Sequence, residues 1–184
     1  GLMINAEVFA DAGLVDADGI PTYPKTWNDV LEMGKIIKEK TGSAALCLLA
    51  KDNAGGWHFS NIAWNFGAQF ETQDENGKWI SHINSPEAIE AMTFVKTMSD
   101  EGLLTSDPTS EDWGTGFTQL GSGAAAMYIG ANDAVAQPTA YNGLAVDKLM
   151  MAAIPAGPRG DQHSLMGGTP YFITASATAD EIDA

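Results

Sequence analysis

The chain of 184 residues is 45% hydrophobic and 18% charged, with aromatic and aliphatic residues spread over its whole length. This composition excludes a disordered protein and suits one compact unit with its own core. Acidic residues outnumber basic residues by 24 to 9, and the formal net charge is −15 at pH 7. Because so acidic a surface repels phosphates, nucleic acid and anionic lipid are excluded as broad-surface partners.

Two further features bear on the compartment of the protein. Cys47 is the only cysteine, so an intrachain disulfide is impossible and we interpret this residue as a small buried hydrophobe. No apolar run approaches the roughly 20 residues that span a bilayer.

The chain opens in an apolar segment without a secretory leader, and Thr178 and Glu181 have capping-box spacing just before its end. We therefore expect a piece of a longer protein.

The first fifty residues alternate between strand and helix patterns. A strand at 2–5 precedes a short helix and a turn-rich stretch. Thr26 and Asp29 have the spacing of a capping box, which predicts a second helix that ends near Gly42. The continuous apolar run at 43–50 predicts a strand that is covered on both faces.

The segment 55–70, GGWHFSNIAWNFGAQF, predicts a helix with two different faces, and a loop at 51–56 leads into it. One face carries the apolar residues that we expect to join the core, which are Phe59, Ile62, Ala63 and Phe66. The opposite face carries Trp57, Asn61 and Trp64. We predict that Trp57 looks into a cleft from the first turn of the helix, whereas Trp64 packs within the protein.

The second half of the chain predicts a hairpin, helices and further strands. Asn76 and Gly77 mark the hairpin turn, and Ser85-Pro86 begins a long helix. The buried face of that helix is predicted to contain Ala88, Ala91, Met92, Val95 and Met98. The remaining elements are a short helix at 112–123, a strand at 124–130, a broken helix at 132–141, and strands at 149–155 and 167–174 with a loop at 156–164 between them.

The alternation of helices and strands, with one inserted hairpin, predicts the α/β class. In open α/β sheets, ligands bind beyond the carboxyl ends of the strands. That rule selects three candidate binding segments, which are 51–57, 130–133 and the glycine-rich stretch near 167–171.

The sequence carries little sign of catalysis. His58 lies near Asp52 and Ser60, which leaves a Ser-His-Asp arrangement open because triads assemble in space. However, the nucleophile elbow, the zinc-protease helix, the dinucleotide fingerprint and the P-loop lysine are all absent. His82 and His163 have no companions that suggest a metal site. We therefore expect a protein without catalytic residues, metal or cofactor.

Carbohydrate binding is better supported by the residues present. Aromatic faces stack on the C–H patches of uncharged sugars, and a few polar side chains bond the hydroxyl groups. The sequence supplies aromatic residues for this purpose in Trp57, Trp64, Trp113, Tyr128 and Tyr171. The candidate segments supply polar side chains in Asp52, Asn53, Asn132 and Asp133.

Several motifs occur in an order that resembles one known family. They are LMINAEVFADAGL, PKTWNDVLEMGKIIKEKTG, INSPEAIEAMTFVKTMSDEGL, FTQLGSGAAAMYIG, and MAAIPAGPRG followed by MGGTPYFIT. Together they resemble family 1 extracellular solute-binding proteins, the sugar receptors of ABC importers related to maltose-binding protein. The resemblance covers nearly the whole chain.

The resemblance implies one lobe of a type II periplasmic-binding-protein-like fold, with helices packed on a central mixed sheet. Residues 1–184 would form the C-terminal lobe, with a hinge crossing near 2–5 and the N-terminal lobe outside the chain. The family's cleft positions nominate as ligand-binding residues Asp52, Asn53, Trp57, His58, Asn132, Asp133, Gly168, Thr169 and Tyr171. The family's Gly-Pro-Trp platform is replaced here by Ala131, Asn132 and Asp133, which favours a sugar other than a malto-oligosaccharide.

These patterns lead to the hypothesis of an extracytoplasmic receptor, lipid-anchored or periplasmic, that binds a mono- or oligosaccharide and serves ABC permease subunits. Two alternatives stay open at this point. One is a carbohydrate-active hydrolase that uses the same cleft, which would need two convergent carboxylates or an activated nucleophile. The other is an extracellular sensor or adhesion module that binds a protein partner.

Overall fold

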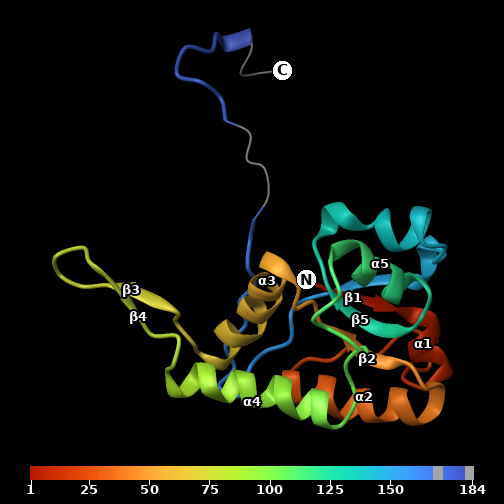
Figure 1. Cartoon of the computed structure of the whole chain (residues 1–184). Coiled ribbons are helices and arrows are strands. Elements are labelled where there is room, and N and C mark those ends of the chain that lie inside the picture. The colour runs from red at the N-terminus through yellow and green to blue at the C-terminus, as the bar shows by residue number, and fades with distance from the viewer. Residues whose placement is uncertain (168–171, 181–184) are drawn as a thin grey trace.

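A four-stranded sheet in the order β2-β5-β1-β6 forms the centre of the computed structural model, which describes residues 1–167 and 172–180 (Figure 1). Its strands are β1 (Leu2–Asn5), β2 (Ala44–Cys47), β5 (Ala125–Ile129) and β6 (Leu149–Ala152). β2 and β5 are parallel, whereas β1 runs antiparallel to both β5 and β6. The sheet is therefore mixed, which confirms the predicted α/β class.

The helices follow the predicted segments. They are α1 (Ala6–Asp11), α2 (Trp27–Thr41), α3 (Asp52–Ala63), α4 (Pro86–Asp100) and α5 (Trp113–Gly121). Short helical turns are formed by Trp64–Phe66, Asn132–Ala134, Gln137–Tyr141 and Val146–Lys148. A separate hairpin of β3 (Glu71–Gln73) and β4 (Trp79–Ser81) projects away from the main sheet (Figure 1). Its turn contains Gly77 at φ +77°, as the Asn-Gly signal predicted.

Side-chain caps fix where the helices begin. The Asp29 backbone N–H donates to the Thr26 hydroxyl at 3.1 Å, and the Thr26 N–H donates to the Asp29 carboxylate at 2.9 Å. This is the predicted capping box of α2, and Gly42 ends the same helix at φ 77°. Asn5 caps α1 in a similar way, because its side-chain oxygen accepts from two backbone N–H groups of that helix. Each cap satisfies donors that a helix otherwise leaves unpaired.

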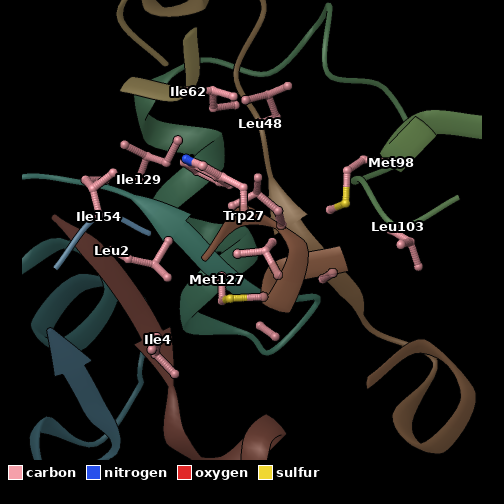
Figure 2. Packing of buried hydrophobic residues seen from close by; sticks show 14 of the residues in the cluster. Leu2, Ile4, Trp27, Leu48, Ile62, Met98, Leu103, Met127, Ile129 and Ile154 are labelled. Atoms are coloured by element: carbon pink, nitrogen blue, oxygen red, sulfur yellow. The ribbon is translucent and has the colours of Figure 1, made fainter. Parts of the chain in front are cut away.

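Side chains that alternate along the strands fill separate cores on the two faces of the sheet. Leu2 and Ile4 of β1 belong to the larger core, together with Met127 of β5 and Trp27 of α2 (Figure 2). Met3, between the first two, joins a smaller cluster. The other fully buried members of that cluster are Cys47, Leu49, Ala54, Leu120, Ala125 and Tyr128. Both faces of the central strands are thus covered, as the continuous apolar run predicted.

The helix α3 contributes to both cores. Ala54 near its beginning joins the smaller cluster, whereas Ile62 and Ala63 near its end join the larger core. The helix also begins earlier than predicted, at Asp52, so the expected loop at 51–56 forms its first turns. Gly55 allows this, because a Cβ there would lie 3.0 Å from the Ala50 carbonyl oxygen.

Other sequence predictions are corrected in the second half of the chain. Met92 of α4 is 51% exposed, because α4 buries the narrower stripe of Ala88, Ala91 and Met98. Residues 172–174 form no strand, and the rest of the strand predicted at 167–174 lies mostly outside the described residues.

Candidate functional site

The carboxyl ends of the two parallel strands, β2 and β5, meet at one edge of the sheet. β1 begins at the same edge because it is antiparallel to β5, with Leu2 opposite Ile129. The amino group of Gly1 donates a hydrogen bond to the Gly130 carbonyl oxygen at 2.9 Å. This is the edge at which open α/β sheets bind ligands, and we call it the carboxyl edge.

An aromatic pocket of about 260 Å³ lies at the carboxyl edge. Its walls come from α3, from α5, from the end of β5 with the residues directly after it, and from Gly167. The residues that line it are Trp57, Trp113, Phe117, Tyr128, Gly130, Ala131, Asp133, Ala134 and Gly167. Trp57 of α3 and Trp113 of α5 meet edge to face, with ring centroids 6.2 Å apart. Two helices distant in sequence thus bring their tryptophans into one pocket.

The helix α5 supplies two rings from one face. Trp113 and Phe117 are four positions apart and therefore neighbours on the helix surface. Phe117 packs against Tyr128 of β5, with ring centroids 5.2 Å apart. Gly116 permits this approach, because a Cβ there would lie 2.5 Å from Cε2 of Tyr128. Burial raises the pKa of Tyr128, so Tyr128 is a neutral aromatic group at pH 7.

An ion pair joins the beginnings of α3 and α5. Lys51 Nζ lies 3.3 Å from Asp112 Oδ2. Asp112 also caps α5 by accepting from the Thr115 backbone N–H at 3.1 Å. That backbone bond, the Thr115 hydroxyl and Lys51 together lower the pKa of Asp112 to about 2. Asp112 is therefore ionised at neutral pH, and its carboxylate both pairs with Lys51 and accepts the hydrogen bond from the Thr115 N–H.

His58 lies behind the aromatic rings rather than in the pocket. Its side chain is fully buried, with ring centroids 5.6 Å from Trp113 and 5.2 Å from Tyr128. Nδ1 accepts a hydrogen bond from the Leu49 N–H at 3.3 Å, and burial lowers the pKa of His58 to about 3. The imidazole is therefore neutral at pH 7 and supports the rings from behind. His58 is thus enclosed and does not line the pocket, and its contact with a ligand stays a prediction.

The structure divides the remaining predicted site residues. Asp133 lines the aromatic pocket, and Asn132 is exposed beside it on the same helical turn. Asp52 and Asn53 are exposed at the beginning of α3 and do not line the pocket. Asp52 adopts φ 52°, a conformation that Asp tolerates better than most residues. The predicted residues Gly168, Thr169 and Tyr171 lie outside the described residues.

Two pocket residues were not found from the sequence. Phe117 could have been found, because it follows Trp113 by four positions on a predicted helix. The other is Ala134, which follows the candidate segment 130–133 directly and carries no signal of its own. Gly167 belongs to the glycine-rich stretch near 167–171 that the sequence selected. Trp113 and Tyr128 were recognised only as part of a general supply of aromatic residues.

A larger hollow of about 830 Å³ lies near the other end of α3. Trp64, Phe70 and the segment 161–164 contribute to it, and it shares no wall residue with the aromatic pocket. Trp64 is therefore half-buried at a surface hollow rather than packed wholly within the protein.

Within the described ranges, no group of three or more His, Cys, Asp or Glu could hold a metal ion. No helix in those ranges has both the length and the apolarity needed to cross a membrane.

Comparison with known proteins gives a clear match at the level of the family. The model of the family described as bacterial extracellular solute-binding protein matches residues 1–183. No curated protein sequence matches the chain.

Solved structures share the fold at low sequence identity. The GacH receptor of Streptomyces glaucescens GLA.O, studied unliganded and with acarbose, has a TM-score of 0.70 and 24% identity over 86% of this chain and 38% of its own. Maltose-bound MalE3 of T. maritima has a TM-score of 0.71 and 22% identity over 88% and 39%. A sugar transporter from Arthrobacter chlorophenolicus A6 with bound laminaribiose has a TM-score of 0.70 and 20% identity over 88% and 37%. The chain therefore spans less than two fifths of the length of each of these proteins.

Proposed function

Because the chain belongs to the bacterial extracellular solute-binding protein family, we propose that it is the C-terminal lobe of a two-lobed receptor that binds a sugar. In this proposal the chain crosses the hinge near residues 2–5, and sequence outside 1–184 supplies the N-terminal lobe. The beginning of β1 lies at the carboxyl edge. That position supports a crossing there, because a segment that links two lobes must border the cleft between them.

The aromatic pocket is the observation that carries the sugar proposal. Trp57 and Trp113 offer flat apolar faces for the C–H side of a sugar ring, and Asp133 offers oxygens to its hydroxyl groups. Asp133 is the only charged residue among the described walls, so the pocket favours an uncharged ligand. Its volume of about 260 Å³ lies just below the roughly 300–1,000 Å³ of complete ligand sites. That difference supports a second lobe that completes the site.

The proposed mechanism is closure of the two lobes around the ligand. A sugar that touches both lobes only in the closed state has a higher affinity for that state and shifts the population towards it. ABC permease subunits would then recognise the closed receptor on the extracytoplasmic side, where the receptor is either periplasmic or held by a lipid anchor.

We propose binding without catalysis. Glycoside hydrolysis uses a pair of carboxylates, whereas the described walls of the pocket carry one, Asp133. The nearby His58 is buried and neutral, so it is poorly placed to act as a base on a substrate. The family and the solved neighbours are binding proteins rather than enzymes.

A thermal-shift screen of sugars on the two-lobed receptor tests this function, because a ligand that binds the native state raises its melting temperature. The screen should include acarbose, maltose and laminaribiose, which occur in the solved neighbours, together with monosaccharides. We expect at least one sugar to stabilise the receptor and to be recovered intact. Recovery of cleaved products would favour the hydrolase alternative, and no stabilisation by any sugar would contradict the proposal.

Trp57→Ala tests the place of the pocket in sugar binding. We expect the affinity for the stabilising sugar to fall at least roughly tenfold, or about 1.4 kcal/mol, in a calorimetric titration, because the stacking surface is lost. Trp79→Ala is the matched control, because Trp79 lies on the projecting hairpin and is 59% exposed. Unchanged affinity in Trp57→Ala would remove Trp57 from the site.

A further inference from the structure

Residues 161–167, which we call the strap, run along one face of α3 in the direction opposite to the helix. The His163 N–H donates to Asn65 Oδ1 at 2.6 Å, and Asn65 Nδ2 donates to the His163 carbonyl oxygen at 2.8 Å. Two residues later, the Leu165 N–H donates to Asn61 Oδ1 at 2.9 Å. After two more residues, Gly167 contacts the ring of Trp57.

The spacing of these contacts matches the geometry of an extended chain against a helix. Two residues of extended chain cover about 6.6–6.8 Å, and four residues of an α-helix rise about 6 Å. The strap residues 163, 165 and 167 can therefore meet positions 65, 61 and 57 in register. Positions 57 and 61 belong to α3, and position 65 belongs to the short helical turn Trp64–Phe66 that continues it. The α3 face that carries Trp57 and Asn61 is thus the surface on which the strap lies.

The two asparagines are buried, and the amide oxygen and amide nitrogen of each make hydrogen bonds. Asn61 is 2% exposed and Asn65 is 0% exposed. Besides their bonds to the strap, Asn61 Nδ2 donates to the Trp57 carbonyl oxygen at 3.0 Å, and Asn65 Nδ2 donates to the Asn61 carbonyl oxygen at 2.6 Å. Apolar side chains at these positions would remove the partners of part-buried backbone groups of the strap, which favours release of the strap from the helix.

Glycines allow the strap and the loop before it to approach α3 closely. A Cβ on Gly167 would lie 2.2 Å from Cη2 of Trp57, so only a residue without a side chain fits against the indole in its present orientation. A Cβ on Gly157 would lie 1.4 Å from the Asn65 carbonyl oxygen. The end of the strap also lines the aromatic pocket through Gly167.

We propose that Asn61 and Asn65 are positioning residues that hold the strap in register, so that Gly167 presses on Trp57 and orients its indole in the pocket. The inference rests on the proposed function in one respect only, namely that Trp57 contacts the ligand. Such support increases affinity, because less conformational entropy is lost when a ligand binds a side chain that is already held in its bound orientation.

The orientation of Trp57 can be measured without any ligand, by fluorine NMR of the full chain labelled with 5-fluorotryptophan. Trp57→Phe assigns the Trp57 resonance. We expect Asn61→Leu and Asn65→Leu to shift or broaden that resonance while leaving the resonances of Trp27 and Trp79 in place. Ser60→Ala is the matched control, because the Ser60 hydroxyl donates within the helix, to the Gly56 carbonyl oxygen, and makes no bond to the strap residues 161–167.

Gly167→Ala gives an independent test that leaves both asparagines intact. Its methyl group should displace the indole and move the Trp57 resonance even if an asparagine variant fails to fold. In titrations with maltose and laminaribiose as probe sugars, we expect the three disruptive variants to bind about fivefold more weakly or worse, because fewer molecules hold the competent conformation.

The outcomes separate this inference from the sugar proposal. An unmoved Trp57 resonance in folded Asn61→Leu, Asn65→Leu and Gly167→Ala would overturn the positioning role, whatever the sugar titrations show. A moved resonance in a protein that no sugar of the thermal-shift screen stabilises would support the positioning role and count against sugar binding.

Discussion

At the scale of single residues, His58 shows how burial decides the chemistry of a side chain. The imidazole packs between Trp113 and Tyr128 and is not hydrated in the folded protein. This desolvation favours its neutral form. Its folded-state pKa of about 3 lies below the ordinary value of 6.5. His58 therefore binds a proton near pH 6.5 in the unfolded chain, but only near pH 3 in the folded chain. The stability that this difference confers is complete above pH 6.5 and is lost as the pH falls towards 3.

We predict that His58→Phe flattens the pH dependence of stability between pH 6.5 and 3. In the wild type, the His58 contribution to the free energy of unfolding falls with a slope that approaches about 1.4 kcal/mol per pH unit below pH 6.5. Phenylalanine keeps an aromatic ring in place but does not titrate. Urea unfolding of both proteins across this range measures the difference, and the carboxylates common to both cancel. Parallel stability curves would mean that His58 titrates normally in the folded protein.

At the scale of secondary-structure elements, the contact between α2 and β2 has no room for a side chain on the helix. A Cβ on Gly34 would lie 2.6 Å from the Cβ of Ala45, and both atoms are attached directly to backbone. The helix can therefore pack closely on the strand only because residue 34 is glycine, although glycine in a helix interior costs about 1 kcal/mol relative to alanine. Close packing is favoured here over helix propensity.

We predict that Gly34→Ala destabilises the protein by about 1–3 kcal/mol, as overpacked cores do, despite the better helix propensity of alanine. Chemical denaturation measures the free energy of unfolding. The double variant Gly34→Ala with Ala45→Gly should recover part of the loss, because it moves the methyl group from strand to helix. A stabilised Gly34→Ala single variant would show that the two elements can separate without cost.

The helix α3 has two faces that are both packed against other parts of the chain. Its Ile62 and Ala63 are buried in the larger core. Its Asn61 is buried beneath the strap, together with Asn65 of the helical turn that follows. On the second face, Gly167 of the strap also lies against the ring of Trp57. Packing therefore buries part of each face, which stabilises a helix that has no wide polar side.

At the scale of the whole molecule, the formal net charge of −15 produces self-repulsion that opposes the compact state. Ion pairs among the described residues lie on the surface, such as Lys96 with Asp100 and Arg159 with Glu90, where each contributes little to stability. Screening by salt should therefore weaken the repulsion more than it weakens the favourable pairs.

We predict that the melting temperature rises when NaCl is increased from about 0.01 to 0.15 M, because the Debye length falls from about 30 to 8 Å. Differential scanning calorimetry measures the change. The double variant Glu39→Gln with Glu75→Gln removes two negative charges at exposed positions and should show a smaller rise. A melting temperature that falls with salt would mean that attractive pairs dominate the electrostatic energy.

Much of the fold could be predicted from the sequence because its signals are local. The capping box of Thr26 and Asp29, the Asn-Gly turn of the hairpin and the proline at the start of α4 each act within a few residues. For the site, Trp57 and Asp133 were predicted, and both line the aromatic pocket. Their contact with a ligand remains a prediction.

What the sequence by itself determined is the order and type of the elements, the acidic surface and the family of the protein, because these follow from local pattern and composition. Only the tertiary structure decided that Trp57 meets Trp113, that His58 is enclosed, and that Asn61 bonds Leu165 across 104 positions of sequence. Such contacts depend on how distant segments pack together. The periodicity of one helix shows that it has two faces but cannot show what covers each of them.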